Sequence, residues 1–202
     1  MQDLDKALAE IGAIRTQLAR SETFHGLGPT AFAATGVLAL LVAIGEARWM
    51  PDPGPHAAAF LTVWIAVAAI SATVIGVEMV GRSRRLHSPL ADEMIVAAVQ
   101  QFLPAGAAGV LITAVLYGFA PQALWAAPAL WQICFSLGIF ASCRFLPRGM
   151  LLVGAWYLAT GVGCLALAQG AHAFAPSAMG LPFGAGQLLV AAVLRFSSPR
   201  DA

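Results

Sequence analysis

Charged residues are scarce in this sequence. Only 10% of its 202 residues are Asp, Glu, Lys or Arg, against about a quarter in soluble globular domains. In contrast, 59% of the residues are hydrophobic. A soluble domain of this size cannot bury so much apolar surface, but a lipid bilayer accepts it on the outside of the protein. The formal net charge is +1, so no strong positive field favours nucleic acid as a partner.

The sequence also lacks the patterns of metal centres and of known catalytic sites. Its three cysteines form no Cys-x-x-Cys pair, and no histidine lies deep within an apolar segment. It contains no HExxH sequence, no Gly-rich phosphate-binding loop and no GxSxG sequence. We therefore expect no metal, no cofactor and no enzymatic activity.

Six apolar segments are each long enough to cross a membrane as a helix, which takes about 20 residues. They cover approximately residues 29–47, 57–80, 89–118, 123–143, 147–168 and 176–196. Pro29, Pro89 and Pro147 begin three of them, as expected for a first helical turn that tolerates a missing N–H. The pattern predicts an all-α membrane protein. A six-transmembrane-helix bundle would occupy residues 26–198, after an N-terminal amphipathic cytoplasmic helix in residues 1–25.

The third segment is the least certain part of this arrangement. Pro104 lies inside it and removes one backbone hydrogen bond from a helix. Two alternatives remain open. The segment is either one kinked span, or an interfacial helix over residues 89–103 followed by a short span.

Basic residues predict the orientation of the bundle. In a six-span arrangement, ten of the eleven Lys and Arg residues fall on one side. These are Lys6, Arg15, Arg20, Arg82, Arg84, Arg85, Arg144, Arg148, Arg195 and Arg200. Arg48 falls on the other side. Because Lys and Arg are enriched in cytoplasmic loops, both termini are predicted to be cytoplasmic. Compactness and alanine richness favour a bacterial inner membrane.

Glutamines inside the apolar segments mark a candidate ligand-binding site. Counting 1.5 Å per residue along each helix places four of them near mid-membrane: Gln100, Gln101, Gln132 and Gln187. Polar side chains at this depth face the bundle interior, so we expect them to converge. Two interpretations remain open. The amides either bond across helices and hold them together, or line a pocket for a small polar or lipid-like ligand.

A cluster of charges is predicted at the cytoplasmic ends of the spans. Its members are Glu78, Arg82, Asp92, Glu93, Arg144 and Arg148. Glu78 and Arg82 are four residues apart, a spacing that lets them form an ion pair on one helix. Asp92 and Glu93 fall in the first turns of the third segment, where the helix dipole favours anions. The cluster is either a ring of paired charges or a site for an anionic headgroup.

The first 25 residues carry an apolar stripe at heptad spacing. Leu4, Ala7, Ile11, Ile14 and Leu18 occupy successive a and d positions, and Leu8 lies beside them. Such a stripe packs against another helix. The polar face is not rich in Lys and Arg, as a helix lying on anionic lipid would be. The partner is therefore expected to be a second copy, a cytoplasmic protein, or the protein's own membrane domain.

These patterns predict a non-enzymatic multi-pass inner-membrane protein with a regulatory, accessory or scaffolding role through its cytoplasmic face. Its expected partners are the lipid bilayer and either a homo-oligomer or a cytoplasmic protein. The alternative is a transporter or permease subunit that binds its ligand at the glutamines. No ionisable residue lies at mid-depth of a predicted span, which disfavours proton-coupled transport.

Overall fold

The computed structural model describes residues 28–50, 56–86, 89–143, 146–167 and 174–197. The described elements are α2 (Pro29–Trp49), α3 (Ala57–Leu86), α4 (Pro89–Phe119), η2 (Pro121–Ala126), α5 (Ala127–Ser142), α6 (Met150–Leu167) and α7 (Pro176–Ser197). Within α3 and α4, the description leaves out the side chains of residues 83, 85–86, 89–95 and 98.

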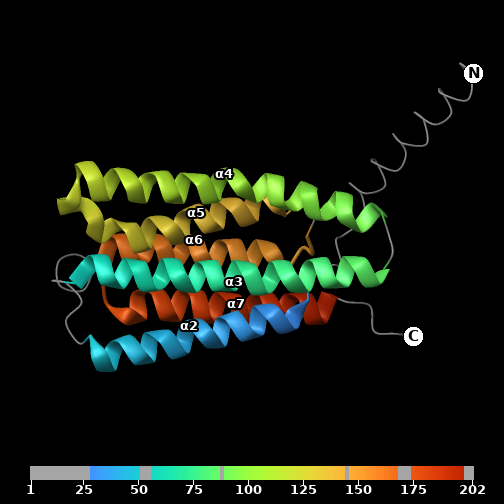
Figure 1. The fold of residues 1–202 in the computed structure, drawn as a ribbon, viewed down its shortest axis with the longest axis horizontal. Coiled ribbons are helices and arrows are strands. Elements are labelled where there is room, and N and C mark those ends of the chain that lie inside the picture. Colours follow the sequence, from blue (N-terminus) through green and yellow to red (C-terminus); the bar gives the residue numbers. More distant parts are fainter. Residues whose placement is uncertain (1–27, 51–55, 87–88, 144–145, 168–173, 198–202) are drawn as a thin grey trace, which may run out of the picture.

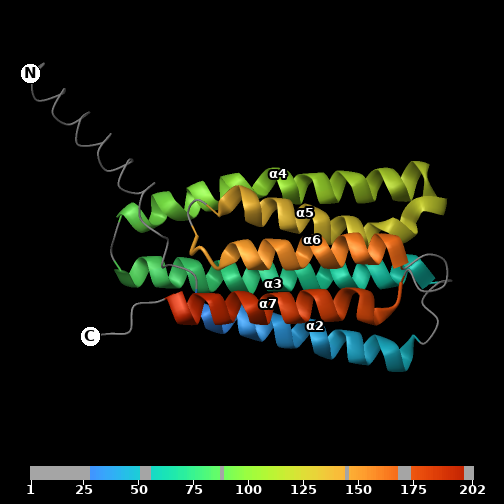
Figure 2. The ribbon, with the colours of Figure 1, turned by 180° about the vertical axis from the view of Figure 1, so that it is seen from behind.

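The described helices form an elongated bundle. Six stretches are long and apolar enough to span a membrane, with η2 and α5 together making one of them. Successive spans run in opposite directions (Figures 1 and 2). The prediction of an all-α, six-helix membrane bundle is confirmed, and the chain is a multi-pass membrane protein. The predicted amphipathic helix of residues 1–25 lies outside the described residues.

The observed helix ends follow from simple properties of the sequence. α4 is one continuous helix through Pro104, so the third segment is not divided into an interfacial helix and a short span. α3 continues to Leu86, past the predicted end at Val80. Hydropathy marks only the apolar part of a helix, whereas the arginines beyond Val80 are good helix formers and extend it.

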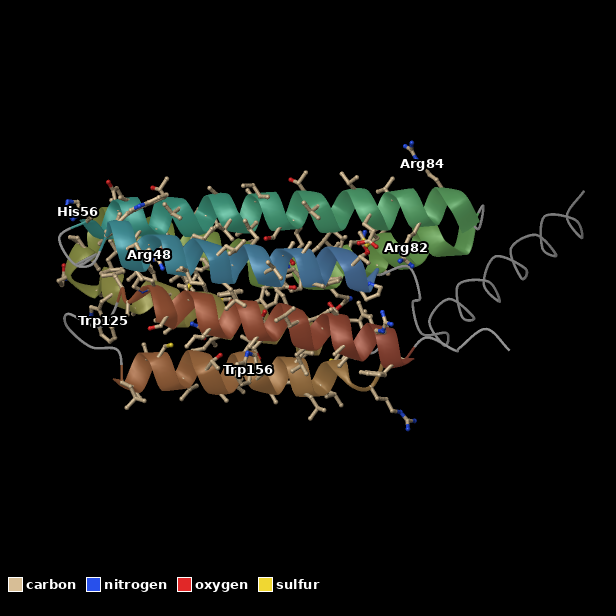
Figure 3. All side chains as sticks on the ribbon, turned by 90° about the horizontal axis from the view of Figure 1, so that it is seen from below. Arg48, His56, Arg82, Arg84, Trp125 and Trp156 are labelled. Atoms are coloured by element: carbon tan, nitrogen blue, oxygen red, sulfur yellow. The ribbon has the colours of Figure 1, made fainter. Side chains whose placement is uncertain are left out.

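The two ends of the bundle differ in charge. Figure 3 shows Arg82 and Arg84 at one end, and Arg48 with His56 at the other. Arg195 lies in the last turn of α7, at the same end as Arg82. We call the end where α2 begins and α7 finishes the arginine-rich end, and the opposite one the Arg48 end.

The most extensive helix pair joins the first and last spans. α2 packs against α7, and the next most extensive pair is α5 with α6. A Cβ atom added at Gly36 would lie only 3.0 Å from the Gly184 carbonyl oxygen, and one at Gly184 would lie 3.4 Å from the Gly36 carbonyl oxygen. In lipid, helices associate through such close van der Waals contact. The small residues of this seam therefore permit the pairing.

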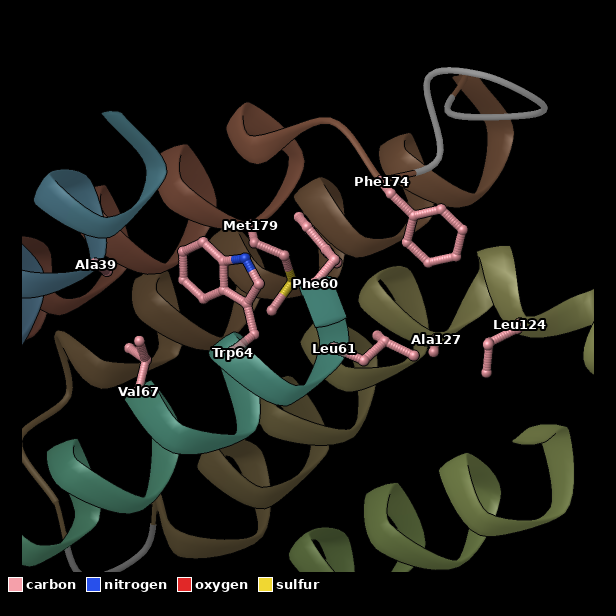
Figure 4. Packing of buried hydrophobic residues seen from close by; sticks show 9 residues of the cluster. All are labelled: Ala39, Phe60, Leu61, Trp64, Val67, Leu124, Ala127, Phe174 and Met179. Carbon is pink, nitrogen blue, oxygen red and sulfur yellow. The ribbon is translucent and has the colours of Figure 1, made fainter. Parts of the chain in front are cut away.

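Two buried apolar clusters fill the bundle. The cluster nearer the Arg48 end comprises Ala39, Phe60, Leu61, Trp64, Val67, Leu124, Ala127, Phe174 and Met179 (Figure 4). The second cluster comprises Ile139, Leu146, Met150, Val153, Tyr157, Val190 and Leu194. Together they draw on α2, α3, η2, α5, α6 and α7. α4 contributes only partly buried side chains, such as Phe102 and Leu116.

α3 and α4 are the peripheral helices. No side chain is buried in the apolar part of α4, Val99–Phe119, and none of the described α3 side chains after Val67 is buried. Both helices continue past the others at the arginine-rich end (Figure 1). Residues 89–98 precede the apolar part of α4 and correspond to about 15 Å of helix at 1.5 Å per residue.

Candidate functional site

Pro182 creates an unpaired carbonyl group inside α7. Proline has no N–H, so the carbonyl of Ala178, four residues earlier, loses its helical donor. Gln132 of α5 replaces that donor, with its Nε2 atom 3.0 Å from the Ala178 oxygen. The Cys164 sulfur of α6 lies 3.6 Å from the same oxygen. Neighbouring helices often pair backbone groups freed by proline in a membrane, and here α5 and α6 both do so.

The carbonyl oxygen of Pro182 itself accepts a hydrogen bond from a side chain of α6. The indole nitrogen of Trp156 on α6 donates to it over 3.0 Å, and Figure 3 labels this side chain. Gln132 is completely buried, with no exposed surface. The Pro182 turn is therefore held by side chains of both α5 and α6. The contact with Ala178 satisfies the buried Nε2 group of Gln132, whose Oε1 atom has no hydrogen-bond partner.

Tyr157 lies at the centre of an aromatic cluster in the bundle. Its ring centroid is 4.7 Å from that of Phe135 and 5.3 Å from that of Phe183. Its side chain has no exposed surface, and its hydroxyl has no hydrogen-bond partner. Gly186 of α7 lies against this hydroxyl and leaves no space for a Cβ atom. Gln187, which follows Gly186 in the sequence, is also buried, and its Oε1 atom has no hydrogen-bond partner.

Glu46 is a buried carboxyl group near the Arg48 end of α2. The indole nitrogen of Trp64 on α3 donates to its Oε2 atom over 2.9 Å. Its Oε1 atom is buried without a hydrogen-bond partner. Only 7% of Glu46 is exposed, and it is the one acidic or basic residue among the buried residues that the structure describes.

Glu78 of α3 caps the first turn of α2 at the arginine-rich end. Its Oε1 accepts from the Thr30 hydroxyl and its Oε2 from the Ala31 backbone N–H, both over 2.8 Å. Arg82 donates to Oε1 over 3.2 Å, as the i,i+4 spacing predicted. Gly28 lies so close to this carboxylate that a Cβ atom would not fit. Glu78 therefore joins α2 to α3.

The structure does not bring the four predicted glutamines together. Gln100 and Gln101 are exposed on α4, and the adjacent Phe102 packs close to Gly138, one turn before α5 ends. Those two glutamines thus lie near the arginine-rich end rather than at mid-membrane. Gln132 and Gln187 are buried. However, Gln132 bonds to Ala178, which precedes Gln187 by nine residues, or about 13 Å of helix.

The predicted charge cluster and partner-binding helix are only partly described. The Glu78–Arg82 pair is present, and Arg148 is exposed before α6. Asp92 and Glu93 belong to α4, but their side chains are outside the description, as is Arg144. Leu4, Leu8, Ile11, Ile14 and Leu18 also lie outside the described residues. No group of three or more metal-binding side chains occurs in the described part of the chain.

Sequence reasoning missed the tryptophans inside the spans and their partners. Trp64 donates to Glu46, Trp156 to Pro182, and Trp131 of α5 to a threonine hydroxyl of α4 over 2.7 Å. A usable signal was present, since a buried indole N–H normally requires an acceptor. Glu46 was the available acidic acceptor in the first apolar segment.

Comparisons with known proteins add no family to this description. No protein family, curated protein or solved structure matches the chain. Its class is therefore defined by the fold: an integral, multi-pass membrane protein with six spanning helices, in which the buried side chains of Glu46, Gln132 and Ser136 form hydrogen bonds to other helices.

Proposed function

We propose that this protein is a non-enzymatic accessory or scaffolding component of a bacterial inner membrane that binds another protein at its cytoplasmic face. The observation that carries the proposal is the extension of α3 and α4 beyond the bundle at the arginine-rich end (Figure 1). The last turns of α3 and the first turns of α4 form a helical hairpin, which we call the α3–α4 hairpin. A hairpin that extends beyond the membrane offers side chains to a partner without disturbing the spans.

The hairpin's packing and charge support this role. Arg84 is exposed near its tip, and Arg82 is only partly engaged with Glu78, with 42% of its side chain exposed. The positive-inside tendency places this end in the cytoplasm. The partner surface proposed here is acidic where it meets Arg82 and Arg84, and its attraction to these arginines decreases as ionic strength rises.

Residues 1–25 provide a second contact in the proposal. Their heptad stripe of Leu and Ile requires a packing partner, because an isolated helix of about 20 residues is marginal in water. In the proposed topology this segment is on the same side of the membrane as the hairpin. A partner held by both contacts would be bound more tightly than by either one.

Site-specific photocrosslinking in intact membranes tests the proposal. A photoreactive residue at position 84 should give a protein adduct, whereas one at position 196 should not. Phe196 is exposed at the same end on α7, a helix that is not part of the hairpin, which makes it the matched control. Adding Arg82→Glu should reduce the adduct at position 84, because it removes the attraction to an acidic surface. Equal adducts at both positions, or none at position 84, would contradict the proposal.

A second candidate function is binding of a small polar ligand within the bundle. The unpartnered Gln187 Oε1 atom favours it, since a buried polar atom without a partner calls for an explanation. A ligand bound there would raise the thermal stability of the protein. A screen of amino acids and polyols should then find a stabilising compound whose effect is lost in Gln187→Leu. An identical response of both proteins would exclude this function at Gln187.

A further inference from the structure

We propose that Glu46 is a proton-binding site which couples the α2–α3 contact to the pH on the Arg48 side of the membrane. This role is separate from partner binding at the arginine-rich end. It depends on a carboxyl group that lies within the bundle and on the arrangement of groups around it.

The neighbours of Glu46 offer no positive charge. Trp64 gives a single hydrogen bond to Oε2, and Trp64 itself belongs to an apolar cluster with side chains of α2, η2, α5 and α7. Figure 4 shows Trp64 beside Phe60 and Met179 in this cluster. None of the cluster's side chains is ionisable.

The other ionisable groups at this end do not compensate the carboxylate. Arg48 follows two residues later on α2 and His56 precedes α3, and both are exposed. Among the described residues, Glu46 forms no ion pair. Asp52 lies in the loop outside the described residues. An acidic neighbour there would in any case favour, rather than oppose, protonation of Glu46.

A buried carboxylate with one hydrogen bond and no cation is strongly disfavoured, and such a group takes up a proton instead. Proton access requires only a short path. Glu46 precedes the end of α2 by three residues, or about 5 Å of helix. The bound proton therefore exchanges with the aqueous phase at the Arg48 end. An ionisable residue inside a membrane bundle commonly marks a functional site.

The proton controls how closely α2 and α3 pack. While Glu46 is neutral, its side chain stays against Trp64 in the apolar cluster. Ionisation makes burial costly and favours a state in which the carboxylate reaches water at the Arg48 end. Because α2 is also the partner of α7, a shift of this end of α2 is transmitted along the most extensive seam of the bundle.

A hydrophobic carbodiimide tests the proposal on the unmodified protein, because such reagents react with protonated carboxyl groups in apolar surroundings. The full chain in lipid nanodiscs is treated at pH 6 and at pH 9 with dicyclohexylcarbodiimide, and the adducts are located by mass spectrometry. The expected adduct is on Glu46, with a yield that falls at least severalfold at pH 9. Glu78 is the internal control, because it is held as a carboxylate by Thr30, Ala31 and Arg82.

A second measurement uses Glu46→Gln, which imitates the neutral carboxyl group. Between about pH 5 and the pH at which Glu46 ionises, the folded protein holds a proton that the unfolded chain has released. The unfolding equilibrium constant of the parent should therefore rise relative to the variant by up to about tenfold per pH unit. Equal carbodiimide yields on Glu46 and Glu78, or a parent that is more stable than Glu46→Gln by the same factor at every pH, would overturn the proposal.

Discussion

The side-chain nitrogen of Gln132 on α5 lies 3.0 Å from the carbonyl oxygen that Pro182 leaves without a donor on α7. Gln132→Leu should therefore destabilise the bundle by about 1–2 kcal/mol, since it leaves the Ala178 carbonyl with only the weak thiol donor of Cys164. Reversible unfolding in mixed micelles gives the free energy of unfolding. Gln122→Leu, at an exposed position of η2, is the matched control and should change stability little.

A double-mutant cycle ties this loss to Pro182. Pro182→Ala restores the backbone N–H that the Ala178 carbonyl lacks, so Gln132→Leu should cost less in that background. The expected coupling energy is about 0.5–2 kcal/mol. A coupling of zero would show that Gln132 stabilises the bundle through other contacts.

Two glycines allow a comparison between a helix surface packed against a neighbouring helix, at Gly184, and one with no neighbour, at Gly163. A Cβ atom at Gly184 would lie 2.5 Å from the Leu40 side chain, whereas one at Gly163 meets nothing within 4 Å. Gly184→Ala should destabilise the protein by about 1–3 kcal/mol through overpacking. Gly163→Ala should stabilise it by up to about 1 kcal/mol through helix propensity. Similar changes in thermal stability for the two variants would contradict the α2–α7 packing.

The Glu78 carboxylate should contribute more to the free energy of unfolding by capping α2 than by pairing with Arg82. Glu78→Ala removes the acceptors of Thr30 and of the Ala31 N–H, so it should cost about 1–2 kcal/mol. Arg82→Ala removes a partly exposed pair, for which about 0–1 kcal/mol is expected. Thermal unfolding of both variants, with and without 0.5 M salt, would separate the two effects. An equal loss for both variants would mean that the ion pair dominates.

The topology can be tested with cysteines at described, exposed positions. In a variant whose native cysteines are replaced, an impermeant maleimide should label His56→Cys and Gln122→Cys from outside spheroplasts. Arg84→Cys and Arg195→Cys should be labelled only after the membrane is opened, because positive residues stay on the cytoplasmic side. Labelling of Arg84→Cys in sealed spheroplasts would reverse the proposed orientation.

The sequence predicts the spans well, because apolar length alone determines which segments can cross a membrane. The sequence predicts the membrane depth of polar side chains poorly. Counting residues from the start of a helix ignores any part of that helix that extends beyond the bilayer. Gln100 and Gln101 were placed at mid-membrane, but α4 begins with ten residues outside its apolar part. Helix pairing was not predictable either. The contacts of Gly36 with Gly184, and of Gln132 with Ala178, depend on tertiary neighbours far apart in the sequence.

The Glu46 carboxyl shows a different limit. Hydropathy treats an acidic residue near the end of a span as interfacial, because such residues often reach water. Only the neighbouring helix reveals that Trp64 covers this one. The tryptophans inside the spans could be expected to donate hydrogen bonds, but the sequence did not show which group on another helix accepts each bond.

The pairing of α2 with α7 has a consequence for biosynthesis. The ribosome releases α2 before α7, so the surface around Gly36 that packs on α7 has no α7 to contact while the intervening spans are made. A nascent chain that stops before Pro176 has no partner for this surface. The α2–α7 pair is thus completed only after α7 has been made, and chains truncated before α7 display an unpaired α2 surface.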